Sequence, residues 1–295
     1  MTISELKDHI QNNNNNVGFV IGNGINRFGN NNSISWDALL QQLWQRVTSQ
    51  DMFIRPNGIS VTEFYDILEL KNNNSEIDLQ KIVSQLLENW NPLNHHQNIV
   101  NKIREWNAPL LTTNFDEVLA RTNNLDAYHL EWTNDFYPWG TYHGTVELSN
   151  PLAGFGIWYI NGMRKYPRSI RLGLTHYMGS VERSRRLIHN GDDRLFNGKA
   201  QHNWKGKNTW LHIVFNKELI VFGLGLEENE TFLRWLLIER KRYFREFPER
   251  EYKSWYLHVN ELEKIPEGKR LFLESVGFDI VEVGTFERLY TYLWE

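Results

Sequence analysis

The sequence predicts an α/β protein built on a parallel β-sheet, and two observations lead to this class. Short, almost wholly apolar runs rich in β-branched residues occur at residues 17–21 and 219–222, and such runs are typical of parallel strands buried on both faces. A glycine follows each run directly and a helical pattern comes after it, which is the strand, turn, helix order of doubly wound sheets. We therefore expect a Rossmann-like parallel sheet with helical insertions.

The length and composition agree with a folded domain of this kind. The chain has 295 residues, of which 41% are hydrophobic, so it is long enough to bury a full core. We expect a single domain over residues 1–295. A helical insertion at about 48–106 and a second excursion from the sheet at about 125–210 complete this prediction.

The composition also excludes several kinds of site. The chain has no cysteine, which excludes a disulfide, a cysteine-bound zinc and a thiol nucleophile. Its net charge of −4 gives no argument for binding to nucleic acid or to an anionic membrane. We find no apolar window long enough to span a membrane and no signal peptide in the first residues, so we expect a cytoplasmic protein without membrane contact.

The first strand leads into a turn suited to phosphate binding. Gly22 and Gly24 follow the strand, and their missing side chains would let backbone N–H groups approach a phosphate. A helix begins at Trp36 with Ser35 as its N-cap. The turn has neither the third glycine of a G-x-G-x-x-G motif nor the lysine of a P-loop, so an ordinary strand-to-helix turn is the alternative interpretation.

Helices surround this turn in the first third of the chain. Apolar residues at helical spacing predict helices at residues 3–11, 61–70, 79–90 and 95–106. The adjacent His95 and His96 have no further ligand at metal-binding spacing, so no metal site is expected.

A second strand ends in a group of polar residues. The apolar residues 110–111 are followed by Thr112, Thr113, Asn114 and Asp116. Ligands of open α/β sheets bind beyond the carboxyl ends of the strands, so we expect these side chains to line a binding site. For Asp116, the alternative is that it caps the helix that follows.

The rest of the chain continues the alternation of helices and strands. The patterns predict helices at 228–244, 271–276 and 286–294, with strands at 256–259 and 279–283. Arginines and lysines between residues 164 and 186 make the middle of the chain basic. A solvated face explains this charge, and a surface for a partner or a nucleic acid is the alternative.

Four short motifs along the chain together resemble one known family. They are Gly22-Asn23-Gly24-Ile25-Asn26 with Trp36-x-x-Leu39-Leu40, then Thr112-Thr113-Asn114-Phe115-Asp116, then Ile157 to Gly162 with Pro167 to Tyr177, and finally Leu219 to Gly225 before a helix. Their order and spacing are similar to those of the SIR2-like family, the bacterial relatives of sirtuins. The resemblance covers roughly residues 17–290 and implies NAD as the substrate.

The resemblance also implies roles for individual residues. Asn114 holds the ribose and the attacking water, and Asp116 orients its loop. The phosphates lie on the loop after the first strand, and the adenosine lies near the late glycine turn. The residues implied for nucleotide binding are Gly22, Asn23, Gly24, Asn26, Arg27, Thr112, Thr113, Gly223, Gly225 and Asn260. For Asn260, a turn-forming asparagine after a strand is the alternative.

Two departures from the family bear on activity. Without cysteine the chain lacks the four-cysteine zinc module of sirtuin deacylases, so NAD hydrolysis is expected in preference to deacylation. Asn161 lies where our alignment places the family's catalytic histidine, and an amide accepts no proton at neutral pH. His143, which belongs to a His-Gly pair, and His176 are the alternative positions of this base.

The resemblance implies an enzyme that hydrolyses NAD to ADP-ribose and nicotinamide, without zinc, in bacterial anti-phage defence. Such proteins are expected to form homo-oligomers and to be switched on by a partner, such as an ATPase, an Argonaute-like protein or a phage component. The alternative is a catalytically degenerate subunit that binds a nucleotide as a sensor or scaffold. Asn161 favours this alternative.

Overall fold

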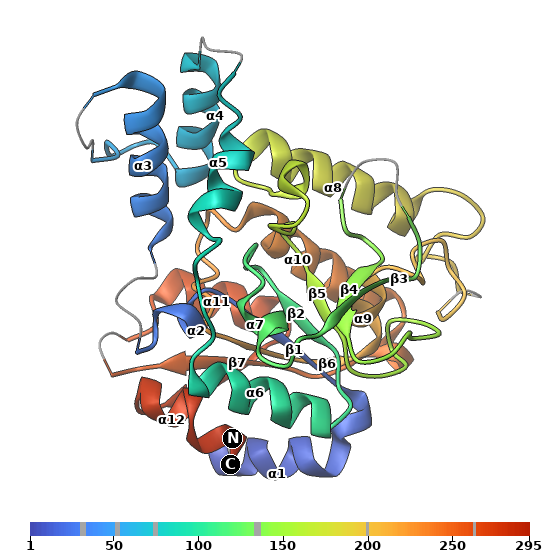
Figure 1. Cartoon of the computed structure of the whole chain (residues 1–295). Helices are drawn as coiled ribbons and strands as arrows, with labels where there is room; N and C mark the ends of the chain where they lie inside the picture. Colours follow the sequence, from blue (N-terminus) through green and yellow to red (C-terminus); the bar gives the residue numbers. More distant parts are fainter. Residues whose placement is uncertain (30–33, 51–53, 73–75, 133–136, 199–200, 262–263) are drawn as a thin grey trace.

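A computed structural model describes residues 1–29, 34–50, 54–72, 76–132, 137–198, 201–261 and 264–295 (Figure 1). Eight strands in these residues form one sheet in the spatial order β3-β4-β5-β2-β1-β6-β7-β8. The strands are β1 (Val17–Ile21), β2 (Leu110–Thr112), β3 (Asp126–His129), β4 (Thr141–Gly144), β5 (Ile157–Tyr159), β6 (Glu218–Phe222), β7 (Ser254–Val259) and β8 (Asp279–Val283). The α/β class and the mostly parallel sheet are therefore confirmed.

The sheet reverses its direction of growth beside β1. Strands β5, β2, β1, β6, β7 and β8 run parallel, whereas β3 and β4 form an antiparallel hairpin on the β5 edge. From β1 the chain first builds outward through β2 to β5, and later through β6 to β7 and β8. The connections that leave β1 and β6 consequently diverge, which opens a crevice beyond their carboxyl ends.

Helices cover both faces of this sheet (Figure 1). One face packs against α1 (Ile3–Asn13), α6 (Asn94–Glu105) and α12 (Phe286–Tyr290), and the other against α8 (Leu174–His189), α9 (Leu211–Asn216), α10 (Thr231–Glu246) and α11 (Glu267–Ser275). Phe19 of β1 packs in the core between the sheet and α1, α6 and α12, and the next residue, Val20, packs in the core on the opposite face, with α8 to α11. This two-sided burial explains why the strands are apolar without alternation.

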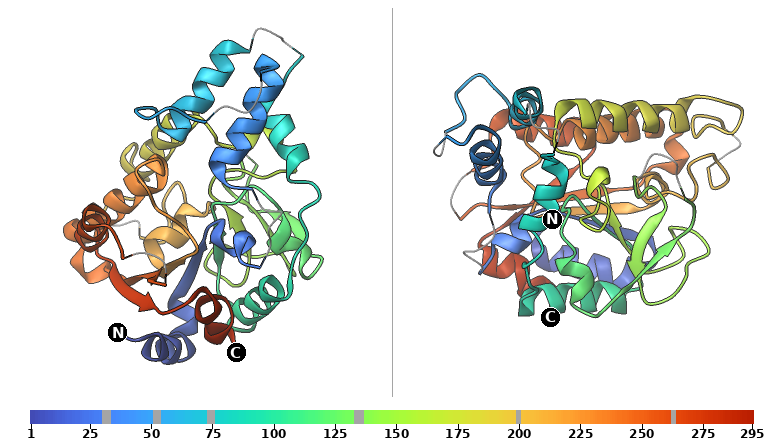
Figure 2. Two further views of the ribbon diagram at one scale, coloured as in Figure 1. Left: turned by 90° about the vertical axis from the view of Figure 1, so that its left-hand side faces the viewer. Right: turned by 45° about the horizontal axis from the view of Figure 1, so that its top comes forward.

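Three helices form a separate cluster with a core of its own. These are α3 (Trp36–Thr48), α4 (Val61–Lys71) and α5 (Leu79–Leu86), which stand away from the sheet in Figure 2. The Ser35 hydroxyl accepts a hydrogen bond from the Ala38 N–H, as expected of an N-cap. The insertion predicted at 48–106 thus has other limits in the structure, because α3 belongs to the cluster and α6 packs on the sheet.

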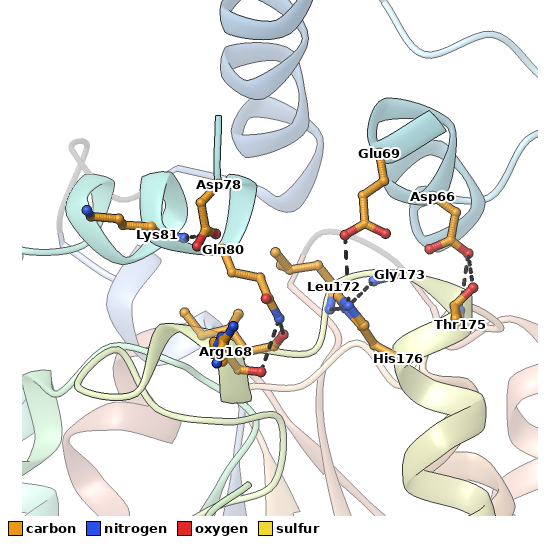
Figure 3. A network of polar contacts seen from close by, with 11 residues as sticks. Asp66, Glu69, Asp78, Gln80, Lys81, Arg168, Leu172, Gly173, Thr175 and His176 are labelled. Carbon is orange, nitrogen blue, oxygen red and sulfur yellow. Dashed lines mark hydrogen bonds and ion pairs between the residues drawn. The ribbon is translucent and has the colours of Figure 1, made fainter. Parts of the chain in front are cut away.

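A network of polar contacts joins the helical cluster to residues 168–176 (Figure 3). The Gln80 side chain donates to the Ile170 carbonyl at 2.7 Å. The Asp66 carboxylate accepts from both the main-chain N–H and the hydroxyl of Thr175, at 3.1 and 3.2 Å. The cluster is therefore fixed to the start of α8 and lies over the crevice, where Trp36 and Val61 line the cavity described next.

Candidate functional site

A cavity of about 640 Å³ lies at the divergence of β1 and β6. Its walls come from the turns that follow β1, β2, β5 and β6, from the strand β7 itself, from the α3–α5 cluster and from α8 and α12. The sequence-predicted residues that line it are Asn23, Gly24, Arg27, Thr113, Asn114, Asp116, Asn161, Gly223 and Gly225. Three of the four motifs noted in the sequence supply most of this set, and Asn161 comes from the remaining one.

Glycines at the cavity floor bring two turns into contact. A Cβ on Gly22 would lie 2.6 Å from the Gly223 carbonyl oxygen, and a Cβ on Gly24 would lie 2.6 Å from the Tyr290 hydroxyl. The Gly24 N–H donates to the Gly223 carbonyl at 2.8 Å, and Gly223 has a φ of +63°. Gly22 does not line the cavity. The backbone of the β6 turn, rather than a ligand, occupies the side that its missing Cβ leaves free.

We expect the Gly22→Ala substitution to lower the free energy of unfolding by about 1–3 kcal/mol, because the new methyl group overlaps the backbone of Gly223. Gly179, inside α8, is a matched control, since a Cβ there has no heavy atom within 4 Å. Gly179→Ala should stabilise the protein by about 1 kcal/mol through helix propensity. Urea unfolding measures both, and equal effects of the two substitutions would contradict this packing.

A buried chain of hydrogen bonds holds the loop after β2. The His96 imidazole donates to the Asn26 side-chain oxygen at 3.0 Å, and the Asn26 amide donates to Asp116 at 2.8 Å. The other Asp116 oxygen accepts from the Val118 N–H at 3.0 Å, at the start of α7 (Val118–Arg121). Burial raises the pKa of Asp116 to about 6 and lowers that of His96 to about 3.

These contacts define what Asn26 and Asp116 do. Asn26 lies under the cavity and does not line it, so its role is to hold Asp116 in place. Asp116 lines the cavity and also accepts from the first turn of α7, so both roles considered for it from the sequence are present in its contacts. Thr112 likewise lies beneath the site, where its hydroxyl donates to the Ile21 carbonyl at 3.2 Å.

Two asparagine amides face the cavity from neighbouring strands. The Asn114 side chain donates to the Gly22 carbonyl at 3.5 Å, and the Asn161 side chain donates to the Thr113 carbonyl at 3.3 Å. Both residues are about 95% buried, with exposed fractions of 5% and 4%. Their side-chain oxygens accept no hydrogen bond from the residues that the structure describes. Each amide is therefore oriented by backbone and keeps an acceptor for a ligand hydroxyl or a water.

The two alternative histidines lie outside the cavity. His143 pairs with Ile157, the first residue of β5, so it lies at the opposite end of the parallel strands from the site. The Nδ1 atom of His176 accepts from the main-chain N–H of Leu172 at 3.2 Å and of Gly173 at 3.4 Å, which caps the start of α8. Burial lowers the pKa of both histidines to about 4. Neither is placed to act on a ligand in the cavity.

The arginines Arg27 and Arg55 of the cavity wall differ in their contacts. Arg55 pairs with Asp37 at 2.9 Å, whereas Arg27 forms no hydrogen bond or ion pair with the described part of the chain. Arg27 therefore offers a guanidinium to an anion beside the Gly24 turn. Asn260 follows β7 and is exposed, its amide donates to Glu282 at 3.3 Å, and it does not line the cavity.

Several lining residues were missed by the sequence analysis. Tyr177 of α8, Glu230 at the start of α10, His258 of β7 and Tyr290 of α12 all contribute to the walls. Burial raises the pKa of Glu230 to about 7, and Glu227 adds to this shift. The only sequence signal for Glu230 was its position shortly after the late glycine turn, where a strand passes into a helix.

Two kinds of feature are not found in the described ranges. No group of three or more histidine, cysteine, aspartate or glutamate side chains there is arranged to hold a metal ion. No described helix combines the length and the apolar composition needed to cross a bilayer.

No protein-family model matches the chain, and no curated protein is significantly similar to it. The function proposed next accordingly rests on the cavity and on the residues that line it.

Proposed function

We propose that this protein hydrolyses NAD to ADP-ribose and nicotinamide. The observation that carries the proposal is the cavity at the divergence of β1 and β6, with Asn114 and Asn161 in its wall. Numbered among themselves, the six parallel strands have the order 3-2-1-4-5-6, which is that of Rossmann folds that bind dinucleotides at this crevice. The four motifs that resemble SIR2-like proteins meet at the same place.

The residues suggest how such a substrate would lie. Arg27 and the backbone of the Asn23–Gly24 turn suit the diphosphate, because a guanidinium and main-chain N–H groups both bind phosphate oxygens. The half of the cavity beside β6 and β7, with Tyr256, accepts the adenosine. The nicotinamide ribose then lies toward Asn114.

The amides provide positioning without a change of charge. Nicotinamide is a good leaving group, so cleavage of the bond between ribose and nicotinamide passes through an oxocarbenium-like state. Asn114 and Asn161 can hold a ribose hydroxyl and one water at fixed places. The water then attacks the ribose from a fixed position and orientation and not through a random encounter. The helical cluster over the crevice limits the access of bulk water.

The wider role follows from the resemblance and is part of the proposal. A NAD-consuming enzyme depletes a metabolite that a phage also needs, so we propose action in the cytoplasm in anti-phage defence. Oligomerisation and an activating partner would raise the low basal activity of the enzyme on infection.

A second function is favoured by one observation. The histidine of sirtuins is replaced by Asn161 in our alignment, and His143 and His176 lie outside the cavity. A subunit that binds NAD or ADP-ribose without cleaving it, as a sensor or scaffold, would have this arrangement.

Incubation of the purified protein with NAD distinguishes the two functions. Mass spectrometry follows NAD, nicotinamide and ADP-ribose, while calorimetry measures the binding of ADP-ribose. We expect equal amounts of nicotinamide and ADP-ribose to form as NAD is lost. Binding without loss of NAD would establish the sensor instead, and the absence of binding would contradict both.

A further inference from the structure

Glu230 is an acidic side chain in the cavity wall, and its carboxyl group has no partner among the residues that the structure describes. It lies at the start of α10, directly after the turn that contains Gly223 and Gly225. Its carboxyl group forms no hydrogen bond or ion pair with any described residue. Nearby acidic residues differ in this respect, because Glu227 pairs with Lys269 at 3.3 Å and Asp37 pairs with Arg55. A carboxyl group that lines a cavity without a protein partner is free to act on a bound ligand.

Tyr177 places Glu230 near the Asn161 wall. Tyr177 is 3% exposed and lines the cavity from α8, which packs against α10. Burial raises the pKa of Tyr177, and the charge of Glu230 and then Tyr137 raise it further. The Tyr137 hydroxyl donates to the carbonyl of Ile160, the residue before Asn161.

A second contact links the same residues. The Arg171 guanidinium lies 4.8 Å from the centre of the Tyr137 ring, and the Arg171 main-chain N–H donates to the Asn161 carbonyl at 2.8 Å. Glu230, Tyr177 and Asn161 line the same cavity, and Tyr137, which does not line it, packs behind Asn161. In the proposed function the reacting ribose lies in this cavity.

Other titratable groups are less suited to accept a proton there. Both oxygens of Asp116 already accept hydrogen bonds, from Asn26 and from the Val118 N–H. His258 belongs to β7, which is four strand spacings from β5, or about 19 Å across the sheet.

We propose that Glu230 is the general base that activates water for attack on the ribose, in place of the histidine that the cavity lacks at Asn161. This inference rests on the proposed NAD hydrolysis and assigns a residue to it. Tyr177 of α8 lines the same cavity.

The step is balanced in atoms and charge. The bond between ribose C1′ and the nicotinamide nitrogen breaks, and its electron pair neutralises the nicotinamide ring. The water oxygen bonds to C1′, and one water proton moves to the Glu230 carboxylate, which releases it to solvent. The same carboxylate stabilises the positive charge that develops on the ribose, because opposite charges attract strongly where water is excluded.

The electrostatic surroundings suit a base that works near neutral pH. Burial and, to a smaller extent, the carboxylate of Glu227 together raise the pKa of Glu230 to about 7. Other charged or titratable groups on the turn and on the packed elements include Glu228, Tyr177, Arg234 and Lys269. Because the deprotonated form is the base, activity should rise with pH through about 7.

The test uses Glu230→Gln, which keeps the size of the side chain and removes the base. Glu228→Gln is the matched control, since Glu228 is exposed on the same turn and does not line the cavity. NAD turnover is measured from pH 5.5 to 8.5, with ADP-ribose binding and thermal unfolding of each variant. We expect Glu230→Gln to lower kcat by about 10²–10⁴-fold. It should also abolish the rise near pH 7 and leave ADP-ribose binding intact.

Each other outcome has a definite meaning. If Glu230→Gln keeps the wild-type rate and pH profile, Glu230 is not the base, while NAD hydrolysis stands. If this variant loses ADP-ribose binding, or if Glu228→Gln loses activity equally, the assigned role is also wrong. A wild-type profile without a rise between pH 6 and 8 overturns the inference even if Glu230→Gln does not fold. A wild-type protein that binds NAD and never cleaves it overturns both the proposed function and this residue's role.

Discussion

Replacing Asn114 by alanine is expected to lower kcat for NAD hydrolysis by about 10²–10³-fold, the usual effect of removing one preorganised hydrogen-bonding group from an active site. The Asn114 side chain is fixed by its bond to the Gly22 carbonyl and is 5% exposed, so no neighbouring side chain replaces its amide in the cavity. Steady-state kinetics should show the loss mainly in kcat, because the adenosine and diphosphate contacts are elsewhere.

Asn89 provides a control for this substitution. It is exposed and does not line the cavity, so Asn89→Ala should leave kcat and KM unchanged. Thermal unfolding of Asn114→Ala separates loss of the amide from loss of the fold. Full activity in a folded Asn114→Ala protein would remove Asn114 from the mechanism.

Replacing Arg240 by alanine is expected to lower the free energy of unfolding by about 3–5 kcal/mol, because it leaves several buried acceptors without a donor. Arg240 of α10 is 2% exposed and donates to the carbonyls of Val214, Lys217 and Tyr252 and to the Ser254 hydroxyl, at 2.7 to 3.2 Å. These bonds hold the helix that begins at Glu230 against β6 and β7. Burial lowers the pKa of Arg240 to about 9, which leaves it charged at neutral pH.

Arg240→Lys tests whether geometry or charge matters. Lysine keeps the positive charge and cannot reach all of these acceptors, so its loss of stability should be intermediate. Urea unfolding at pH 7 measures both variants. A lysine variant as stable as the wild type would contradict the role assigned to the planar guanidinium.

The strands β1, β2, β6, β7 and β8 and most helices could be predicted because their signals are local, whereas β3 and β4 were not predicted. Two-sided burial makes a run such as β1 apolar throughout, and helical periodicity marks α4 and α6. The limits of the helical insertion predicted at 48–106 were harder to predict from the sequence. Periodicity shows that α6 has one apolar face, and only the folded chain shows that Ile99 and Ile103 on this face pack against the sheet and not against α3–α5.

Part of the candidate site could be predicted from the sequence for a similar reason. Asn114 and Asn161 follow strands, and the carboxyl ends of parallel strands meet at one edge of the sheet. The placement of His143 depends on β4 being antiparallel, which its sequence does not reveal. Glu230, Tyr177 and Tyr290 reach the cavity through helix packing over long sequence separations, so no local pattern marks them.

A crystal structure of the protein with ADP-ribose tests the proposed site and orientation of the nucleotide. The account predicts the diphosphate against the Asn23–Gly24 turn within reach of Arg27, the adenosine beside Tyr256, and the terminal ribose next to Asn114. ADP-ribose bound elsewhere on the molecule, or in the reverse orientation with adenine against Asn114, would contradict the account.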